Sequence, residues 1–120
     1  MSAREWPDKV NDIRLTEHFR LREFECPCCR CVQVSPALLH GLEELRGLWG
    51  KPVIITSGYR CAEHNLWVKG VPNSLHMRGR AADIVVPEAE QDAVAAMARK
   101  AGFDSVILYG KRNFMHLGVS

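Results

Sequence analysis

The amino-acid sequence predicts an α+β fold in which a small, mostly antiparallel sheet is flanked by helices. Three observations predict it: apolar residues recur at helical spacing over residues 36–49, short β-branched runs stand between turn residues, and an alanine-rich helical stretch covers residues 88–100. The length of 120 residues, with 47% hydrophobic and 25% charged side chains, is typical of one compact domain. We therefore expect a single domain over residues 15–120, preceded by a loosely ordered lead-in over residues 1–14.

The first predicted helix follows a long polar segment. Residues 1–11 include a proline and follow neither the helical nor the strand period, so they belong to the lead-in. Ser35 and Pro36 are a favourable N-cap and first helical residue. Apolar residues then recur every three or four positions, at Leu38, Leu39, Leu42, Leu45 and Trp49. We expect this helix to end near Gly50.

The middle of the chain combines short strands with a short helix. Residues 53–56 are apolar and β-branched, which predicts a buried strand. A short helix is expected to end near Val68, before a loop over residues 69–74 that is rich in Gly, Pro, Asn and Ser. Residues 80–86 predict the next strand, which Pro87 ends.

The C-terminal third predicts a helix and a hairpin. The alanine-rich helix covers residues 88–100, with Gly102 as its C-cap. Two strands follow, over residues 105–109 and 114–119, and residues 110–113 form the turn between them.

Composition and charge exclude several classes of function. The formal net charge is +2, and the basic residues are spread from Arg4 to Arg112, so we expect no nucleic-acid partner. No run of about 18 apolar residues is present, and no apolar stretch follows the first charged residues. We therefore expect neither membrane insertion nor a signal peptide.

The cysteines are the most unusual feature of the composition. Four of the five lie within six residues, at Cys26, Cys28, Cys29 and Cys31, and we expect the isolated Cys61 to be buried. This spacing differs from a dispersed disulfide framework. Structural zinc sites normally need two cysteine pairs on separate turns, and this cluster has no second pair nearby. Two interpretations stay open: a turn of free thiols, and a second metal site.

Two histidines and one aspartate carry a different signal. Asp83 lies in an apolar predicted strand, where an unpaired carboxylate is costly to bury, and His116 lies in the apolar final strand. If these strands are antiparallel neighbours, both side chains converge with His76 as a ligand set suited to zinc, with a fourth position open for water. The alternative is that Asp83 pairs with Arg78 or Arg80 and that His116 is a satisfied core residue.

Several motifs occur in an order that resembles a known family. They are Ser57-Gly-Tyr-Arg60, Glu63-His-Asn65, Ser74-x-His76-x-x-Gly79-x-Ala-Ala-Asp83 and Phe114-Met-His116, preceded by Leu15-Thr-Glu-His-Phe-x-Leu-x-Glu-Phe24 and a cysteine pair. The chain resembles the zinc D-alanyl-D-alanine carboxypeptidase and murein endopeptidase family, which includes small phage endolysins. The resemblance runs from about Leu15 to Val119, essentially the whole chain.

This resemblance implies a Hedgehog/DD-peptidase-like fold that holds Zn²⁺ on His76, Asp83 and His116. It also implies that Arg60 binds substrate and that Ser74 supports the first ligand or the substrate. The implied activity is metal-assisted hydrolysis of peptidoglycan stem peptides, at a terminal D-Ala or within a cross-link. We expect a monomer that is cytoplasmic, or phage-encoded and released to the cell wall.

The sequence departs from this family where a general base is expected. Many active members carry an acidic residue three positions before the last histidine and others carry one two positions after it, but these positions are Asn113 and Gly118 here. Asparagine cannot take up a proton at neutral pH. Either Glu63, His64 or Asp104 supplies the base, or the enzyme is slow, or the protein is an inactive zinc-binding module of a phage virion or of the cell wall.

Overall fold

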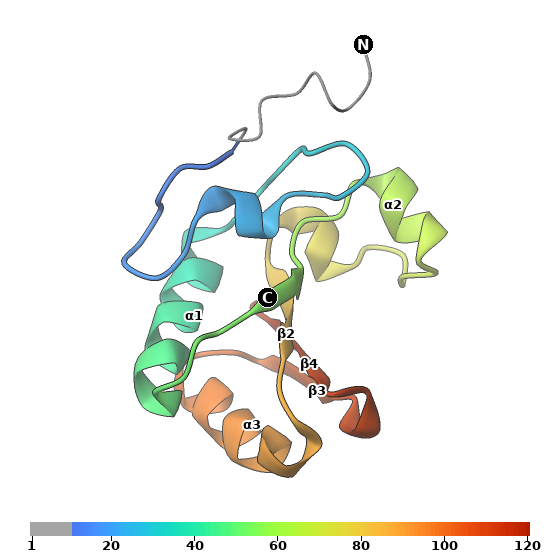
Figure 1. The fold of residues 1–120 in the computed structure, drawn as a ribbon. Coiled ribbons are helices and arrows are strands. Elements are labelled where there is room, and N and C mark those ends of the chain that lie inside the picture. Colours follow the sequence, from blue (N-terminus) through green and yellow to red (C-terminus); the bar gives the residue numbers. More distant parts are fainter. Residues whose placement is uncertain (1–10) are drawn as a thin grey trace.

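The computed structural model describes residues 11–120, which fold around one four-stranded sheet (Figure 1). The strands are β1 (Ile55–Ser57), β2 (Ala81–Val85), β3 (Ser105–Leu108) and β4 (Phe114–Gly118). Their order in the sheet is β1-β2-β4-β3, and every neighbouring pair is antiparallel. The helices are α1 (Pro36–Trp49), α2 (Ala62–Trp67) and α3 (Gln91–Lys100). The predicted α+β class and antiparallel sheet are therefore confirmed.

The longest of these helices, α1, begins and ends at the predicted signals. The Ser35 hydroxyl accepts a hydrogen bond from the Leu38 amide at 3.1 Å, and Pro36 occupies the first helical position. Gly50 ends the helix with φ of 75°, a left-handed conformation that favours glycine. No helix among the described residues is both long and apolar enough to cross a membrane.

Strand alternation gives the sheet two different faces. The core-facing residues of β2 and β4 are Ala82, Ile84, Met115 and Leu117, all fully buried. Helices α1 and α3 lie side by side on this face and contribute to the same core (Figure 1). Because successive side chains of a strand point to opposite sides, Asp83 and His116 lie on the other face of the sheet.

Two elements begin two or three residues later than the sequence predicts. Strand β1 starts at Ile55 rather than at residue 53, so its pairing with β2 is short. A 3₁₀ turn over Glu88–Glu90 precedes α3. The buried Gln91 side chain bonds to the Val86 carbonyl and to both backbone polar atoms of Gly110, which ties the start of α3 to the β3–β4 connection.

The C-terminal hairpin is confirmed, with small differences at its edges. Helix α3 is capped by Ala101, and Gly102, the predicted C-cap, follows with φ of 104°. A 3₁₀ turn over Gly110–Arg112 joins β3 to β4. Asn113 follows this turn in the left-handed conformation, with φ of 57°.

The segment before α1 is held against the domain. Phe19 and Phe24 are buried in the core. Asn11, which falls within the predicted lead-in, donates a side-chain hydrogen bond to the Arg30 carbonyl at 2.9 Å. Residues 1–10 of that lead-in lie outside the described residues. Figure 1 shows the segment before α1 at the same end of the molecule as α2.

Candidate metal centre

Asp83 and His116 are direct neighbours on the open face of the sheet. The register of β2 and β4 pairs their Cα positions, as the antiparallel arrangement of these strands predicts. His76 reaches the same place from a 3₁₀ turn, Leu75–Arg78, that precedes β2. Gly79 ends this turn with φ of 66°, where a Cβ atom would lie 2.4 Å from a neighbouring backbone carbonyl oxygen. Glycine is therefore required where the chain passes from His76 into β2.

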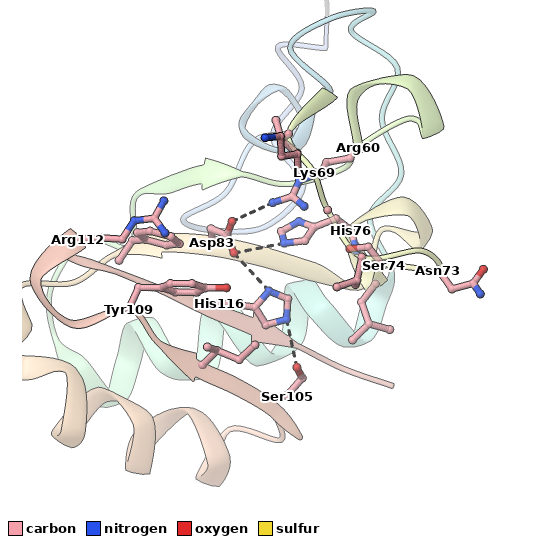
Figure 2. Close-up of a pocket in the computed structure, with 16 residues that line it drawn as sticks. Arg60, Lys69, Asn73, Ser74, His76, Asp83, Ser105, Tyr109, Arg112 and His116 are labelled. Atoms are coloured by element: carbon pink, nitrogen blue, oxygen red, sulfur yellow. Dashed lines mark hydrogen bonds and ion pairs between the residues drawn. The ribbon is translucent and has the colours of Figure 1, made fainter. Parts of the chain in front are cut away.

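The three side chains converge on the Asp83 carboxylate (Figure 2). His76 Nε2 lies 3.3 Å and His116 Nδ1 lies 3.4 Å from Asp83 Oδ1. Zinc bonds of about 2.0–2.1 Å in tetrahedral geometry separate neighbouring ligand atoms by about 3.4 Å. Each histidine nitrogen therefore stands at the distance from the Asp83 oxygen that a shared zinc-sized cation requires.

Hydrogen bonds outside the cluster orient both imidazoles. His76 Nδ1 donates to the Gly58 carbonyl at 2.7 Å, which leaves the lone pair of the neutral ring on Nε2. His76 Nε2 is buried and makes no hydrogen bond. His116 Nε2 bonds to the Ser105 hydroxyl at 3.2 Å, which turns Nδ1 toward Asp83. A buried nitrogen that has no hydrogen-bond partner and faces a carboxylate can be satisfied by a divalent cation bound to both groups.

Asp83 is almost buried, with 7% of its surface exposed, and it remains ionised. Burial raises the pKa of this carboxyl, but the His116 and His76 rings beside it outweigh burial and hold the pKa well below its ordinary value. Arg60 Nη2 also donates to Asp83 Oδ2 at 3.2 Å. The cation beside Asp83 is therefore Arg60, and neither Arg78 nor Arg80 is its partner.

Arg60 and Ser74 both lie at the centre and both hold neighbouring groups in place. The Arg60 guanidinium also bonds to the Ser57 hydroxyl at 3.2 Å and to Asn65 Oδ1 at 3.4 Å, so most of its donors are engaged within the protein. The buried Ser74 hydroxyl accepts from the His76 amide at 3.2 Å. Arg60 thus positions Asp83, and Ser74 caps the turn that carries His76.

A pocket of about 640 Å³ opens over the three side chains (Figure 2). Its rim includes Lys69 and Arg112, two basic residues that the motifs did not single out. Arg112 lies over the rings of Tyr109 and Phe114, with its guanidinium carbon 5.5 Å and 5.0 Å from their centroids. Figure 2 shows the Tyr109 hydroxyl pointing toward His116. A basic hairpin turn beside a predicted ligand strand was the available sequence signal for Arg112.

The predicted candidates for a general base lie elsewhere. Glu63 and His64 line a separate hollow on α2, and Asp104 bonds to the last residue of the chain. Asn113 points away from the pocket, where its side-chain oxygen accepts from the Glu88 amide at 3.0 Å. Among the described residues that line the pocket, Asp83 is the only acidic one. Glu63, His64 and Asp104, the candidates for the base, are thus not among the residues that line the pocket.

Gly118 has a packing reason for its small size. A Cβ atom at this position would lie 2.8 Å from Leu75 Cδ1 and 3.3 Å from His116 Nε2. The side chain of Leu75 therefore occupies the space that an acidic side chain would need beside His116.

His76, which is buried, and His116, which is half-buried, stand with the Asp83 carboxylate beneath a pocket, and this group could hold a metal ion as catalytic zinc sites do. Residues 17–118 match the family described as Peptidase M15, and the chain belongs to that family. This membership confirms the resemblance to the zinc D-alanyl-D-alanine carboxypeptidases. No curated protein matches the chain.

Proposed function

We propose that the protein is a zinc-dependent peptidase that cleaves peptidoglycan stem peptides, as a D-Ala-D-Ala carboxypeptidase or as a murein endopeptidase of the endolysin type. The observation that carries this proposal is the orphaned His76 Nε2 facing the Asp83 carboxylate and His116 Nδ1. Zinc bound by these residues would supply Lewis acidity that polarises a peptide carbonyl and activates water.

The charge of the pocket supports an anionic peptide as substrate. Stem peptides carry free carboxylates, and Lys69 and Arg112 stand at the rim over the centre. Arg112 is held in place by Tyr109 and Phe114, so its guanidinium can pair with a carboxylate without a large loss of side-chain entropy. The Tyr109 hydroxyl is placed to donate to an oxygen that gains charge during hydrolysis.

A second candidate is a zinc-binding module that does not hydrolyse peptides. The absence of an acidic residue other than Asp83 from the described lining of the pocket favours it, because no carboxylate outside the ligand set can accept a proton from water. Such a module would serve a phage virion or bind the cell wall. The peptidase itself would be cytoplasmic, or phage-encoded and released to the cell wall.

Digestion of purified peptidoglycan, followed by mass spectrometry of the products, separates the two candidates. The zinc-loaded wild type is expected to release defined peptide fragments, and His76→Ala to release none. His40→Ala is the matched control, because His40 is an exposed histidine on α1. Zinc binding without any fragment would favour the non-hydrolytic module, and equal activity in His76→Ala would refute both the centre and the proposal.

A further inference from the structure

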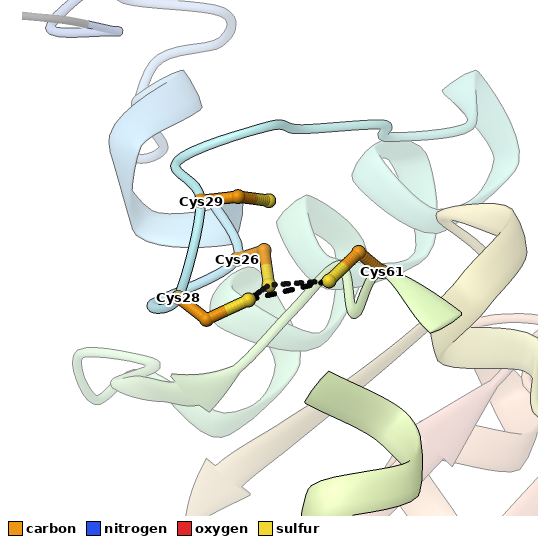
Figure 3. Close-up of side chains that lie close together, drawn as sticks. All are labelled: Cys26, Cys28, Cys29 and Cys61. Carbon is orange, nitrogen blue, oxygen red and sulfur yellow. Dashed lines mark hydrogen bonds between the residues drawn. The ribbon is translucent and has the colours of Figure 1, made fainter. Parts of the chain in front are cut away.

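Four cysteine sulfurs meet at one point away from the pocket (Figure 3). Cys26 Sγ lies 3.4 Å from Cys28 Sγ and 3.6 Å from Cys61 Sγ, and Cys28 Sγ lies 3.3 Å from Cys61 Sγ. With Cys29, these atoms all lie within 4.8 Å of one another. The fourth member, Cys61, comes from the chain after β1, 32 residues beyond Cys29, so the fold completes a cluster that the sequence leaves open.

The sulfur separations fit a shared metal ion better than they fit disulfides. A disulfide holds two sulfurs at about 2.05 Å, whereas four thiolates on tetrahedral zinc at about 2.3 Å stand about 3.8 Å apart. The observed distances of 3.3–3.6 Å are close to the second value. We propose that Cys26, Cys28, Cys29 and Cys61 bind a structural Zn²⁺, separate from the centre formed by His76, Asp83 and His116.

The backbone around the cluster has the form of a ligand loop. The Cys26 amide donates to the Cys31 carbonyl at 2.8 Å and the Arg30 amide donates to the Cys26 carbonyl at 2.7 Å, which closes a tight turn. The His64 amide donates to Cys61 Sγ at 3.4 Å, an interaction that stabilises a thiolate. Cys26 is buried, and Cys28 and Cys29 are exposed, so a metal ion has a path from solvent.

Two sequence predictions about the cysteines change as a result. Cys31, predicted as a member of the cluster, is not in the group of sulfurs that lie within 4.8 Å of one another, and Cys61 takes its place. Cys61 is half-buried rather than buried. The reason is a long-range contact: the Tyr59 amide donates to the Phe24 carbonyl at 2.8 Å, which brings Cys61 to the cysteine turn.

The cysteine site would clamp the segment that orients His76. Gly58 packs so closely on Phe24 that a Cβ atom there would lie 2.6 Å from Phe24 Cα. The carbonyl of this same Gly58 accepts from His76 Nδ1, and the Arg60 amide donates to the His76 carbonyl at 3.1 Å. A metal that links the cysteine turn to Cys61 therefore holds together the two segments that meet where Gly58 packs on Phe24.

Metal content of protein purified under reducing conditions tests the site without any measurement of activity. We expect about two zinc ions per chain in the wild type, and about one in His76→Ala and in Cys61→Ser. Cys31→Ser is the matched control and is expected to keep both. Thermal unfolding should report the clamp, with the Tm of Cys61→Ser lower than that of Cys31→Ser by more than about 5 °C.

Cobalt binding decides the question if Cys61→Ser does not fold. In His76→Ala, where the cysteine site alone should remain occupied, Co²⁺ bound by four thiolates is expected to give intense sulfur-to-metal absorption in the near ultraviolet. Three results would each overturn the assignment. Cys31→Ser and Cys61→Ser could lose equal amounts of metal, this absorption could be absent, or the native mass could reveal disulfides. Because none of these readouts depends on hydrolysis, an inactive protein would leave the cysteine site standing.

Discussion

His76 Nε2 and Asp83 Oδ1 are two hydrogen-bond acceptors that stand 3.3 Å apart in a buried place. The hydrogen bond from His76 Nδ1 to the Gly58 carbonyl is the reason, because it places the ring proton on Nδ1 and leaves the lone pair of Nε2 facing Asp83. Arg60 neutralises the Asp83 charge from one side but does not reach Nε2. A cation between the two acceptors removes the repulsion, so the side chains are already organised for metal binding.

Ser105→Ala tests the hydrogen bond that orients His116. Removal of the hydroxyl frees the ring to rotate, and we expect the dissociation constant for zinc at the His76–Asp83–His116 centre to rise by about 10-fold. Competition with a chromophoric chelator measures this constant. Ser120→Ala, which removes a hydroxyl that bonds to Asp104, is the control. Equal zinc affinity in both variants would mean that Ser105 does not position the ligand.

Asn113→Asp tests whether a missing acid explains any lack of activity. The side chain caps the backbone of Glu88 and does not line the pocket. We therefore expect the rate of peptide hydrolysis to change less than about two-fold, since an acid there cannot reach the reacting groups. Product release from muropeptides, followed by chromatography, gives the rate. A rise of ten-fold or more would contradict the position that the structure assigns to this residue.

At the scale of elements, local patterns predict the ligands but not their neighbours. The apolar strands around Asp83 and His116 mark both polar residues as unusual, and antiparallel pairing brings them together. Periodicity holds no information on contacts between distant segments, so it does not predict the proximity of Cys61 to the cysteine turn. The sequence does not single out the rim residues Lys69 and Arg112, because exposed basic residues in loops are common. Arg60 was found through a motif, but its bond to Asp83 depends on the fold.

The contact between residues 16–18 and α1 predicts a pH dependence of stability. Glu43 on α1 accepts hydrogen bonds from the His18 amide at 2.7 Å and from the ring Nδ1 of His18 at 2.6 Å. Burial raises the pKa of Glu43, but the neighbouring Thr16 and His18 outweigh burial and keep the pKa below 4.5, its ordinary value. A carboxyl with a lowered pKa stabilises the folded state above its unfolded pKa, and this contribution disappears as the pH falls through the folded pKa.

We therefore expect the free energy of unfolding to decline as the pH falls below about 4.5, and Glu43→Gln to remove part of that decline. At pH 7 the same variant should lose about 1 kcal/mol. Urea denaturation at several pH values measures both effects. Glu44→Gln is the matched control, since its carboxylate is half-exposed on the same helix. Identical pH profiles for Glu43→Gln and the wild type would show that the contact with His18 does not stabilise the fold.

At the scale of the whole molecule, stability and chemistry occupy opposite faces of one sheet. Helices α1 and α3 cover the apolar face, and the other face carries Asp83 and His116 beneath the pocket. The segment before α1 closes one end and brings the cysteine turn beside Cys61. The centre is built from four separate parts of the chain. They are the segment after β1 with Gly58, the turn with Ser74 and His76, strand β2 with Asp83, and strand β4 with His116.

Anomalous X-ray diffraction from crystals of the zinc-loaded protein, recorded on both sides of the zinc absorption edge, tests the metal centre most directly. We predict a strong peak about 2.0–2.2 Å from His76 Nε2, His116 Nδ1 and one Asp83 oxygen, with the fourth position facing the pocket. A His76→Ala crystal, treated in the same way, should lack this peak. Two results would contradict this prediction. One is a crystal that binds zinc at another site but shows no peak between the three side chains, and the other is an undiminished peak in His76→Ala.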